Sequence, residues 1–336
     1  MGLIVLCYHH VSREKGITPE GFEENLVILK DSKWTPVKLS EIEDCGKGKF
    51  VHLTFDDGYD DIPDFVAPIV QKHGFYGTVF VITDRVGTPG YLSWDRLREL
   101  KKSGRFAIEA HGHMHNRHFV SSEPFRFNTG IHYQHDLDVI YGGHARIGYP
   151  LFTLRSDLYG NRFYPDEEMN SHMAAFAEEY GGKDFADSEG FQKRMFREYK
   201  NYIKTGKTGH SETDSERAER VKKDILTSKE LVRENLGAGQ DYFCYPRGEY
   251  DDRLPDIVAE CGFKGAFTLD PGLNTEKNPF LIKRIDVKKG SLWFQSRLAI
   301  YSFKIPGMAY NSIKKIPADK IKNKFNKKRK NPKPGH

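Results

Sequence analysis

The chain has 336 residues, of which 38% are hydrophobic and 29% charged, and its formal net charge is +5. A chain of this length and composition buries a large core, which excludes a disordered protein. It also contains no apolar run near the roughly 18 residues that a membrane-spanning helix needs.

The cysteines and the first residues bear on location. Cys7, Cys45, Cys244 and Cys261 include no C-x-x-C pair, which favours free thiols in a reducing compartment. The opening run "MGLIVLCYHH" reads as a buried strand rather than a secretion signal. We therefore expect a cytoplasmic protein.

Strand-like and helix-like segments alternate through the first third of the chain, which predicts a parallel α/β sheet. Capping residues support the predicted helices, because Gly74 is typical of a helix end and a serine at position 93 is typical of a helix start. We predict strands over residues 3–8, 50–55, 76–83 and 106–111, and helices over 19–32, 62–74 and 93–104.

The pattern breaks after His118 and returns near residue 228. The middle is rich in Gly, Tyr, Phe and charge, with a predicted helix over 189–204 and a predicted polar linker over 205–216. Helix and strand alternate again over 228–237, 242–248, 253–262 and 265–272. We predict a first barrel part at 1–118, an insertion at 119–227 that serves as a lid or substrate-binding region, and the rest of the barrel at 228–303.

Residues 304–336 form a basic tail with eleven Lys and Arg and one acid, a net charge of +10, so the first 303 residues sum to −5. Such a tail either stays solvated or contacts an anionic membrane surface. The tail lacks any known nucleic-acid-binding module, so we expect no nucleic-acid partner.

Acids and histidines follow the predicted strands. "LTFDDGYDD" places Asp56 and Asp57 after one strand, and "EAHGHMHNRH" places His111 and His115, four apart, after another. Taken singly, an Asp-Asp-Gly is usually a turn, and two such histidines are usually structural. Together, two imidazoles and a carboxylate match a three-ligand metal site that activates water, with Asp57 as ligand and Asp56 as base.

These stretches, with "FCYPRGEYDD" (243–252), resemble the polysaccharide deacetylase family, also called carbohydrate esterase family 4 or the NodB homology group. The resemblance covers about residues 3–118 and 228–287. It implies a distorted (β/α) barrel that removes N-acetyl groups from amino sugars with a divalent metal. Zinc is the expected ion, with Co²⁺, Ni²⁺ or Fe²⁺ as alternatives.

The resemblance also implies roles for single residues. Asp56 matches the family's base, and Asp57, His111 and His115 match its metal ligands. Positions 244–248 match the R-x-P-Y-G motif, so the backbone N–H of Arg247 is expected to bind the oxyanion. Tyr245 and Pro246, from the same motif, are expected to contact substrate.

The chain departs from the family's pattern at four points. Gly112 replaces a hydroxyl residue between the histidines, Cys244 stands where the base-steadying arginine is expected, and Arg247 stands at the tyrosine position. A late L-x-H histidine, the usual general acid, is absent.

The insertion offers His144 as a proton donor and Arg146 as a substrate contact, although a solvated loop histidine is the simpler interpretation of His144. His113 and His118 are expected beside the metal site or at the surface.

The sequence thus predicts a metal-dependent hydrolase that removes an acyl group, acetyl by expectation, from an amino sugar in a glycan or lipid-linked glycan precursor. Two alternatives stay open. One is a non-catalytic carbohydrate-binding barrel, and the other is a hydrolase of a non-sugar amide.

Overall fold

The computed structural model describes residues 2–237, 241–275, 278–287 and 290–302, so the predicted basic tail lies outside the described residues. The chain divides into two compact units. The first comprises Met1–Phe80, Gly87–Ile108 and Phe267–His336, and the second comprises Val81–Val86 and Glu109–Ala266. The segments that we predicted as 1–118, 119–227 and 228–303 stay predictions as domain boundaries.

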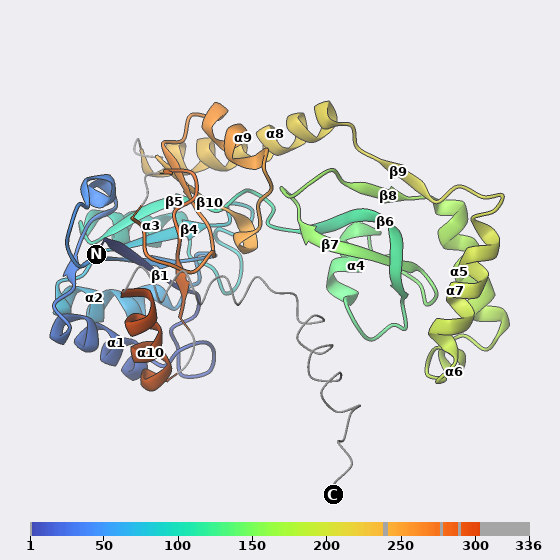
Figure 1. The fold of residues 1–336 in the computed structure, drawn as a ribbon, viewed down its shortest axis with the longest axis horizontal. Helices are drawn as coiled ribbons and strands as arrows, with labels where there is room; N and C mark the ends of the chain where they lie inside the picture. The colour runs from blue at the N-terminus through green and yellow to red at the C-terminus, as the bar shows by residue number, and fades with distance from the viewer. Residues whose placement is uncertain (1, 238–240, 276–277, 288–289, 303–336) are drawn as a thin grey trace, which may run out of the picture. The chain divides into compact units, whose positions relative to one another are not determined.

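The first unit contains parallel strands and flanking helices. Strand β3 pairs in parallel with β1, β2 and β4, and β1 pairs in parallel with β12. Helix α1 lies beside α10 (Figure 1). The strands are β1 (Leu3–Tyr8), β2 (Thr35–Pro36), β3 (Phe50–Phe55), β4 (Gly77–Val81) and β12 (Ile285–Asp286). The helices and turns are α1 (Pro19–Asp31), η1 (Leu39–Asp44), η2 (Ile62–Val66), α2 (Ala67–His73), α3 (Trp94–Lys102) and α10 (Ser291–Ser302).

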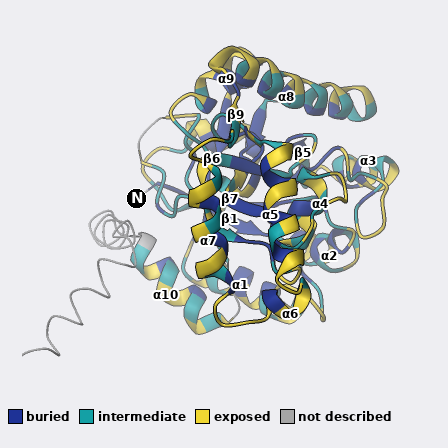
Figure 2. Cartoon of the chain, turned by 90° about the vertical axis from the view of Figure 1, so that its right-hand side faces the viewer, coloured by how far each residue is buried: buried dark blue, intermediate teal, exposed yellow. Residues whose placement is uncertain are grey.

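Local sequence accounts for these elements. All six residues of β1 are buried (Figure 2), as a strand covered on both faces requires. The side chain of Thr18 caps α1 and that of Ser93 caps α3, by accepting backbone N–H groups of the first turn. Gly74, with φ 75°, ends α2 in the left-handed conformation that glycine adopts at least cost. The strands and helices predicted here are confirmed.

The second unit holds the late strands and two antiparallel strand pairs. Strand β10 pairs in parallel with β5, while β6 pairs with β7 and β8 with β9 antiparallel. The strands are β5 (Phe106–Ala110), β6 (Arg117–Phe127), β7 (Pro150–Ser156), β8 (Phe163–Pro165), β9 (Gly209–Ser211), β10 (Tyr242–Cys244) and β11 (Gly265–Phe267). The helices and turn are α4 (Gln134–Ile140), α5 (Glu167–Glu179), α6 (Lys183–Ala186), α7 (Phe191–Tyr202), α8 (Asp214–Leu236), η3 (Pro246–Gly248) and α9 (Leu254–Glu260).

The predicted fold class, a distorted (β/α) barrel with a large insertion, is confirmed. Strands β4, β5 and β11 each run from one unit into the other, and the parallel strands curl into part of a barrel. Between β5 and β10 lie β6–β9 and α4–α8. Of these, β6–β8 and α4–α7 build a hydrophobic core of their own around residues such as Phe127, Phe152 and Met195.

The prediction of a polar linker over residues 205–216 is wrong. Those residues contain β9 and the start of α8, whose 23 residues continue to Leu236, through the boundary predicted at residue 227. A capping box starts the helix, because Thr213 and Glu216 each accept the other's backbone N–H. In the part of the chain that the structure describes, no helix is both long and apolar enough to cross a membrane.

Candidate active site

Asp56 follows β3 in the first unit and is held by Arg284, which precedes β12 by one residue. The guanidinium Nη1 donates to Oδ1 at 2.6 Å and Nη2 donates to Oδ2 at 2.8 Å, and both side chains are buried. Arg284 is itself fixed, because Nε donates to the Thr268 carbonyl at 2.8 Å and Nη1 donates to the Thr54 hydroxyl at 3.1 Å. A two-pronged pair of this kind sets both the charge and the orientation of the carboxylate.

Arg284 therefore supplies the arginine that the sequence motif lacks. The motif places Cys244 where an arginine is expected, and we predicted that the base would be without this support. Arg284 and Asp56 are separated by 228 positions in the chain. The sequence gives no signal for this role, because Arg284 is one of three charged residues in the stretch "FLIKRIDV".

Cys7 is a second neighbour of the Asp56 carboxylate. Its Sγ lies 3.4 Å from Oδ2, at the distance of a thiol hydrogen bond. Burial, partly opposed by the charge of Arg284, raises the pKa of this thiol well above its usual value. Cys7 is therefore a protonated donor to Asp56, and not a nucleophile.

Asp57 has left-handed backbone geometry, with φ 72°, and is followed by Gly58 with φ 80°. This conformation is uncommon for a residue with a side chain, although Asp tolerates it better than most. It turns the chain sharply after β3. Tyr59 lies next to it, and burial and then the Asp57 charge raise the pKa of the Tyr59 hydroxyl.

His111 and His115 lie together in the second unit. His111 directly follows β5, and its N–H donates to the Val81 carbonyl at 2.9 Å. The two imidazole centroids are 4.8 Å apart. The His111 Nδ1 atom lies 2.9 Å from the Cys244 carbonyl oxygen. Since a carbonyl only accepts, Nδ1 carries the proton, and Nε2 is left with the lone pair that a metal ligand needs.

The turn between the histidines is braced by Asp224 of α8. Its carboxylate accepts the N–H of His113 at 2.9 Å and that of Met114 at 3.1 Å. Gly112 has φ 82°, and a Cβ there would stand 3.2 Å from Asp224 Oδ1. Both facts favour glycine over the expected hydroxyl residue. Asp224 is thus a supporting residue that the sequence did not reveal.

The stretch after β10 carries the predicted oxyanion and substrate contacts. Arg247 has left-handed geometry, φ 60° and ψ 10°. Tyr245 and Pro246 are fully buried, and burial raises the pKa of the Tyr245 hydroxyl. The roles of all three residues stay predictions.

The insertion residues His144 and Arg146 lie in the exposed loop after α4. Their predicted roles also stay predictions. The predicted metal site joins Asp57 of the first unit with His111 and His115 of the second, and as a joint site it stays a prediction as well.

Two comparisons with known sequences bear on this site. The family model for polysaccharide deacetylase matches residues 43–147 and 192–266, more than half of the chain. The gap at 148–191 falls inside the predicted insertion. The poly-β-1,6-N-acetyl-D-glucosamine N-deacetylase of Escherichia coli K12 is 21% identical over 299 residues, 81% of this chain and 34% of that protein. The Staphylococcus aureus protein of the same name is 32% identical over 112 residues, 30% of this chain and 38% of that protein.

Solved structures share the fold. IcaB from Ammonifex degensii has a TM-score of 0.54 and 21% identity, with 88% of this chain and 95% of that chain covered. A de-N-acetylase from Aggregatibacter actinomycetemcomitans has a TM-score of 0.60 and 17% identity, with 89% and 100% covered. The chain spans less than half the length of the two curated relatives.

Proposed function

The chain belongs to the polysaccharide deacetylase family, and we propose that it hydrolyses the N-acetyl group of an amino sugar in a glycan of the poly-N-acetylglucosamine type. The names of the two curated relatives support this substrate class. The observation that carries the proposal is the buried Asp56–Arg284 pair. A carboxylate whose charge is offset and whose direction is fixed suits a general base.

The proposed cofactor is a divalent metal, with zinc as the expected ion, and Asp57, His111 and His115 would hold it. The donor set fits, because two imidazoles and one carboxylate are the protein ligands of many catalytic zinc sites. The His111 tautomer fits as well, since the Cys244 carbonyl fixes the proton on Nδ1. When bound, such an ion polarises a carbonyl and makes water more acidic.

Each residue of the site would then have a separate role in the reaction. Asp56 takes a proton from the attacking water, and Arg284 keeps the carboxylate aimed while it does so. The Arg247 N–H donates to the oxygen that becomes negative as the amide carbon turns tetrahedral. The C–N bond then breaks, and the amine leaves with a proton, for which we propose His144 as the donor.

An acetate-release screen tests this function. We expect the purified chain with added zinc to release acetate from β-1,6-linked N-acetylglucosamine oligomers. Glycan binding without any release would favour the non-catalytic barrel. Release from simple amides alone would favour the non-sugar hydrolase.

Location and membrane contact are further proposals that rest on sequence alone. We propose a cytoplasmic enzyme whose basic tail, residues 304–336, contacts an anionic membrane surface that presents a lipid-linked sugar. Co-sedimentation with anionic vesicles should weaken as salt rises and should be lost when the tail is removed. Equal binding to neutral vesicles would contradict this.

A further inference from the structure

A cavity of about 900 Å³ lies in the second unit and is lined only by residues between His113 and Thr227. Its volume is in the range of small-molecule sites. The walls come from β6, β8, α4, α5 and α8, with the loop residues between them. The lining contains none of the residues proposed above for catalysis or metal binding.

Polar atoms without partners line this cavity. Both polar side-chain atoms of Asn170 make no hydrogen bond with any described residue, and the same holds for Nε of Arg162. Asn170 is 1% exposed and His118 is 2% exposed. A hydrogen bond between the His118 ring and the Tyr159 backbone favours the protonated ring, so one ring nitrogen at most is left for a ligand. Buried polar groups are nearly always paired, so an unpaired set around one cavity points to a ligand.

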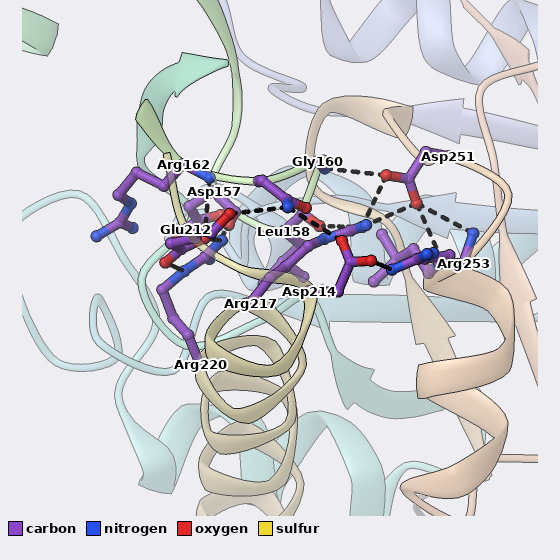
Figure 3. A network of polar contacts seen from close by, with 12 residues as sticks. Asp157, Leu158, Gly160, Arg162, Glu212, Asp214, Arg217, Arg220, Asp251 and Arg253 are labelled. Carbon is purple, nitrogen blue, oxygen red and sulfur yellow. Dashed lines mark hydrogen bonds and ion pairs between the residues drawn. The ribbon is translucent and has the colours of Figure 1, made fainter. Parts of the chain in front are cut away.

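The wall that carries Arg162 is held by a network of hydrogen bonds and ion pairs. Arg220 donates to Glu212 through Nε at 2.6 Å and Nη2 at 2.8 Å, and it also donates to the Asp157 carbonyl (Figure 3). Glu212 in turn accepts the Arg162 N–H at 2.9 Å. These bonds tie α8 to the start of β8. In Figure 3 the Arg162 side chain points away from this network, and its guanidinium lies over the Tyr164 ring, 5.8 Å from the ring centroid.

The mixture of donors and acceptors identifies the ligand chemistry. Asn170 offers both an acceptor oxygen and an N–H₂ group, while the neutral His118 ring, whose N–H is bonded to the Tyr159 backbone, offers one acceptor nitrogen. Burial, and then the charges of Arg220 and Arg162, lower the pKa of His118 to about 3, which keeps the ring neutral. A phosphate or carboxylate only accepts, so it would leave the Asn170 oxygen unpaired. Of the basic side chains in the lining, Arg117 is already paired with Asp136 and Arg220 with Glu212. The lining acids Glu167 and Asp224 offset the charge of the other two, so the cavity carries no excess of positive charge for an anion.

Hydroxyl groups both donate and accept, and aromatic rings line the rest of the cavity, among them Phe119, Tyr141 and Tyr164. Aromatic surface with a few placed polar groups suits a sugar ring. We propose that this cavity binds a neutral sugar unit of the glycan, other than the unit that loses its acetyl group. The proposal rests on the proposed function, because it assigns a second contact to the same substrate.

The test uses Asn170→Leu, which removes the polar atoms at similar volume. Asn201→Leu, at an exposed site on α7 outside the cavity, is the matched control. Arg162→Met, which keeps the aliphatic stem, is the second cavity variant. The probes are β-1,6-linked N-acetylglucosamine oligomers of one to six units, and binding is measured by calorimetry in the full chain carrying Asp56→Asn, so that turnover is not required.

We expect both cavity variants to bind the hexamer about tenfold more weakly, and the control to bind it normally. Asn170→Leu should unfold at the same temperature or higher, since an unpaired buried amide destabilises the free protein. With Asp56 intact, kcat/KM should fall for the hexamer and not for the shortest substrate.

Unchanged hexamer binding by folded Asn170→Leu and Arg162→Met would overturn the proposal. A lower unfolding temperature for Asn170→Leu with no selective loss on long oligomers would do the same, because it would show that Asn170 is structural and paired with water. Failure of the wild-type chain to release acetate would refute the proposed function, yet the binding comparison would still decide the role of the cavity.

Discussion

At the residue scale, the proposed general base Asp56 is one member of a buried ion pair. The carboxylate and the Arg284 guanidinium are both buried and joined by two hydrogen bonds. Removing one member of a buried ion pair destabilises a protein far more than removing both. This difference lets positioning be tested separately from folding.

Arg284→Met leaves the Asp56 charge buried without this partner. We expect the free energy of unfolding to fall by about 3–5 kcal/mol, and acetate release to fall at least about 100-fold because the base loses its orientation. Urea unfolding and acetate assays measure the two effects. The double variant Asp56→Asn/Arg284→Met should regain much of the stability and none of the activity. A single variant as stable as the wild type would refute the ion-pair account.

Asp157 links stability to pH. Burial, and then the charge of Asp224, raises the pKa of Asp157 to about 7, against the opposing effects of the Asn116 N–H and of Arg220 and Arg162. An unfolded Asp titrates near a pKa of about 3.9. Since the folded pKa is the higher one, the ionised form is penalised in the folded state. Asp157 therefore contributes to the free energy of unfolding in its protonated form. This contribution is fully present below about pH 4 and is lost as pH rises through 7.

Asp157→Asn removes this penalty while keeping an acceptor oxygen. We expect the variant to be more stable than the wild type at pH 8, by up to about 4 kcal/mol, and the gap to shrink by pH 5. Urea denaturation at both pH values measures it. A difference in the free energy of unfolding between variant and wild type that is the same at pH 5 and pH 8 would show that Asp157 does not titrate in this range.

The acids and histidines of the candidate site could be proposed from the sequence because each lies in a short motif after a strand. Arg284 and Asp224 could not. Arg284 lies 228 positions from Asp56, and Asp224 lies 111 positions from His113. Neither contact leaves a local pattern, because only the tertiary fold brings the partners together.

At the element scale, α8 supports both the candidate site and the cavity. It carries Asp224, which braces the turn between the histidines, and Arg220, which pairs with Glu212. Its start escaped prediction because the first turns are polar, and the buried face begins with Arg217, paired with Asp251 at 2.7 Å. Apolar periodicity, which revealed α1 and α3, is therefore absent there. Strands β6 and β7 were not predicted for another reason, because register shifts interrupt their pairing.

The capping box of α8 offers a test at this scale. Thr213→Ala removes the hydroxyl that accepts the Glu216 N–H at 3.3 Å. We expect the free energy of unfolding to fall by about 1 kcal/mol, without a change in bound metal. Chemical denaturation and elemental analysis check both points. Thr213→Ser, which keeps the hydroxyl, is the control, and an equal loss in both variants would rule out the cap as the cause.

At the scale of the whole molecule, the barrel class followed from alternating strands and helices and from motifs after strands, and it is confirmed. The division into two units was not foreseen, because it cuts through β4, β5 and β11 rather than between elements. The family match also resumes at residue 192, inside the segment predicted as an insertion. Sequence motifs therefore do not locate the compact units of the chain.

The central claim is that Asp56 is the general base of a metal-dependent deacetylation. The most direct measurement is acetate release from a β-1,6-linked N-acetylglucosamine oligomer by the wild type and Asp56→Asn, compared at equal metal content by elemental analysis. We predict that the variant binds as much metal as the wild type and releases acetate at least about 100-fold more slowly, because general-base catalysis contributes about 10²–10⁴-fold. Release at the wild-type rate, with the metal equally bound, would contradict the account.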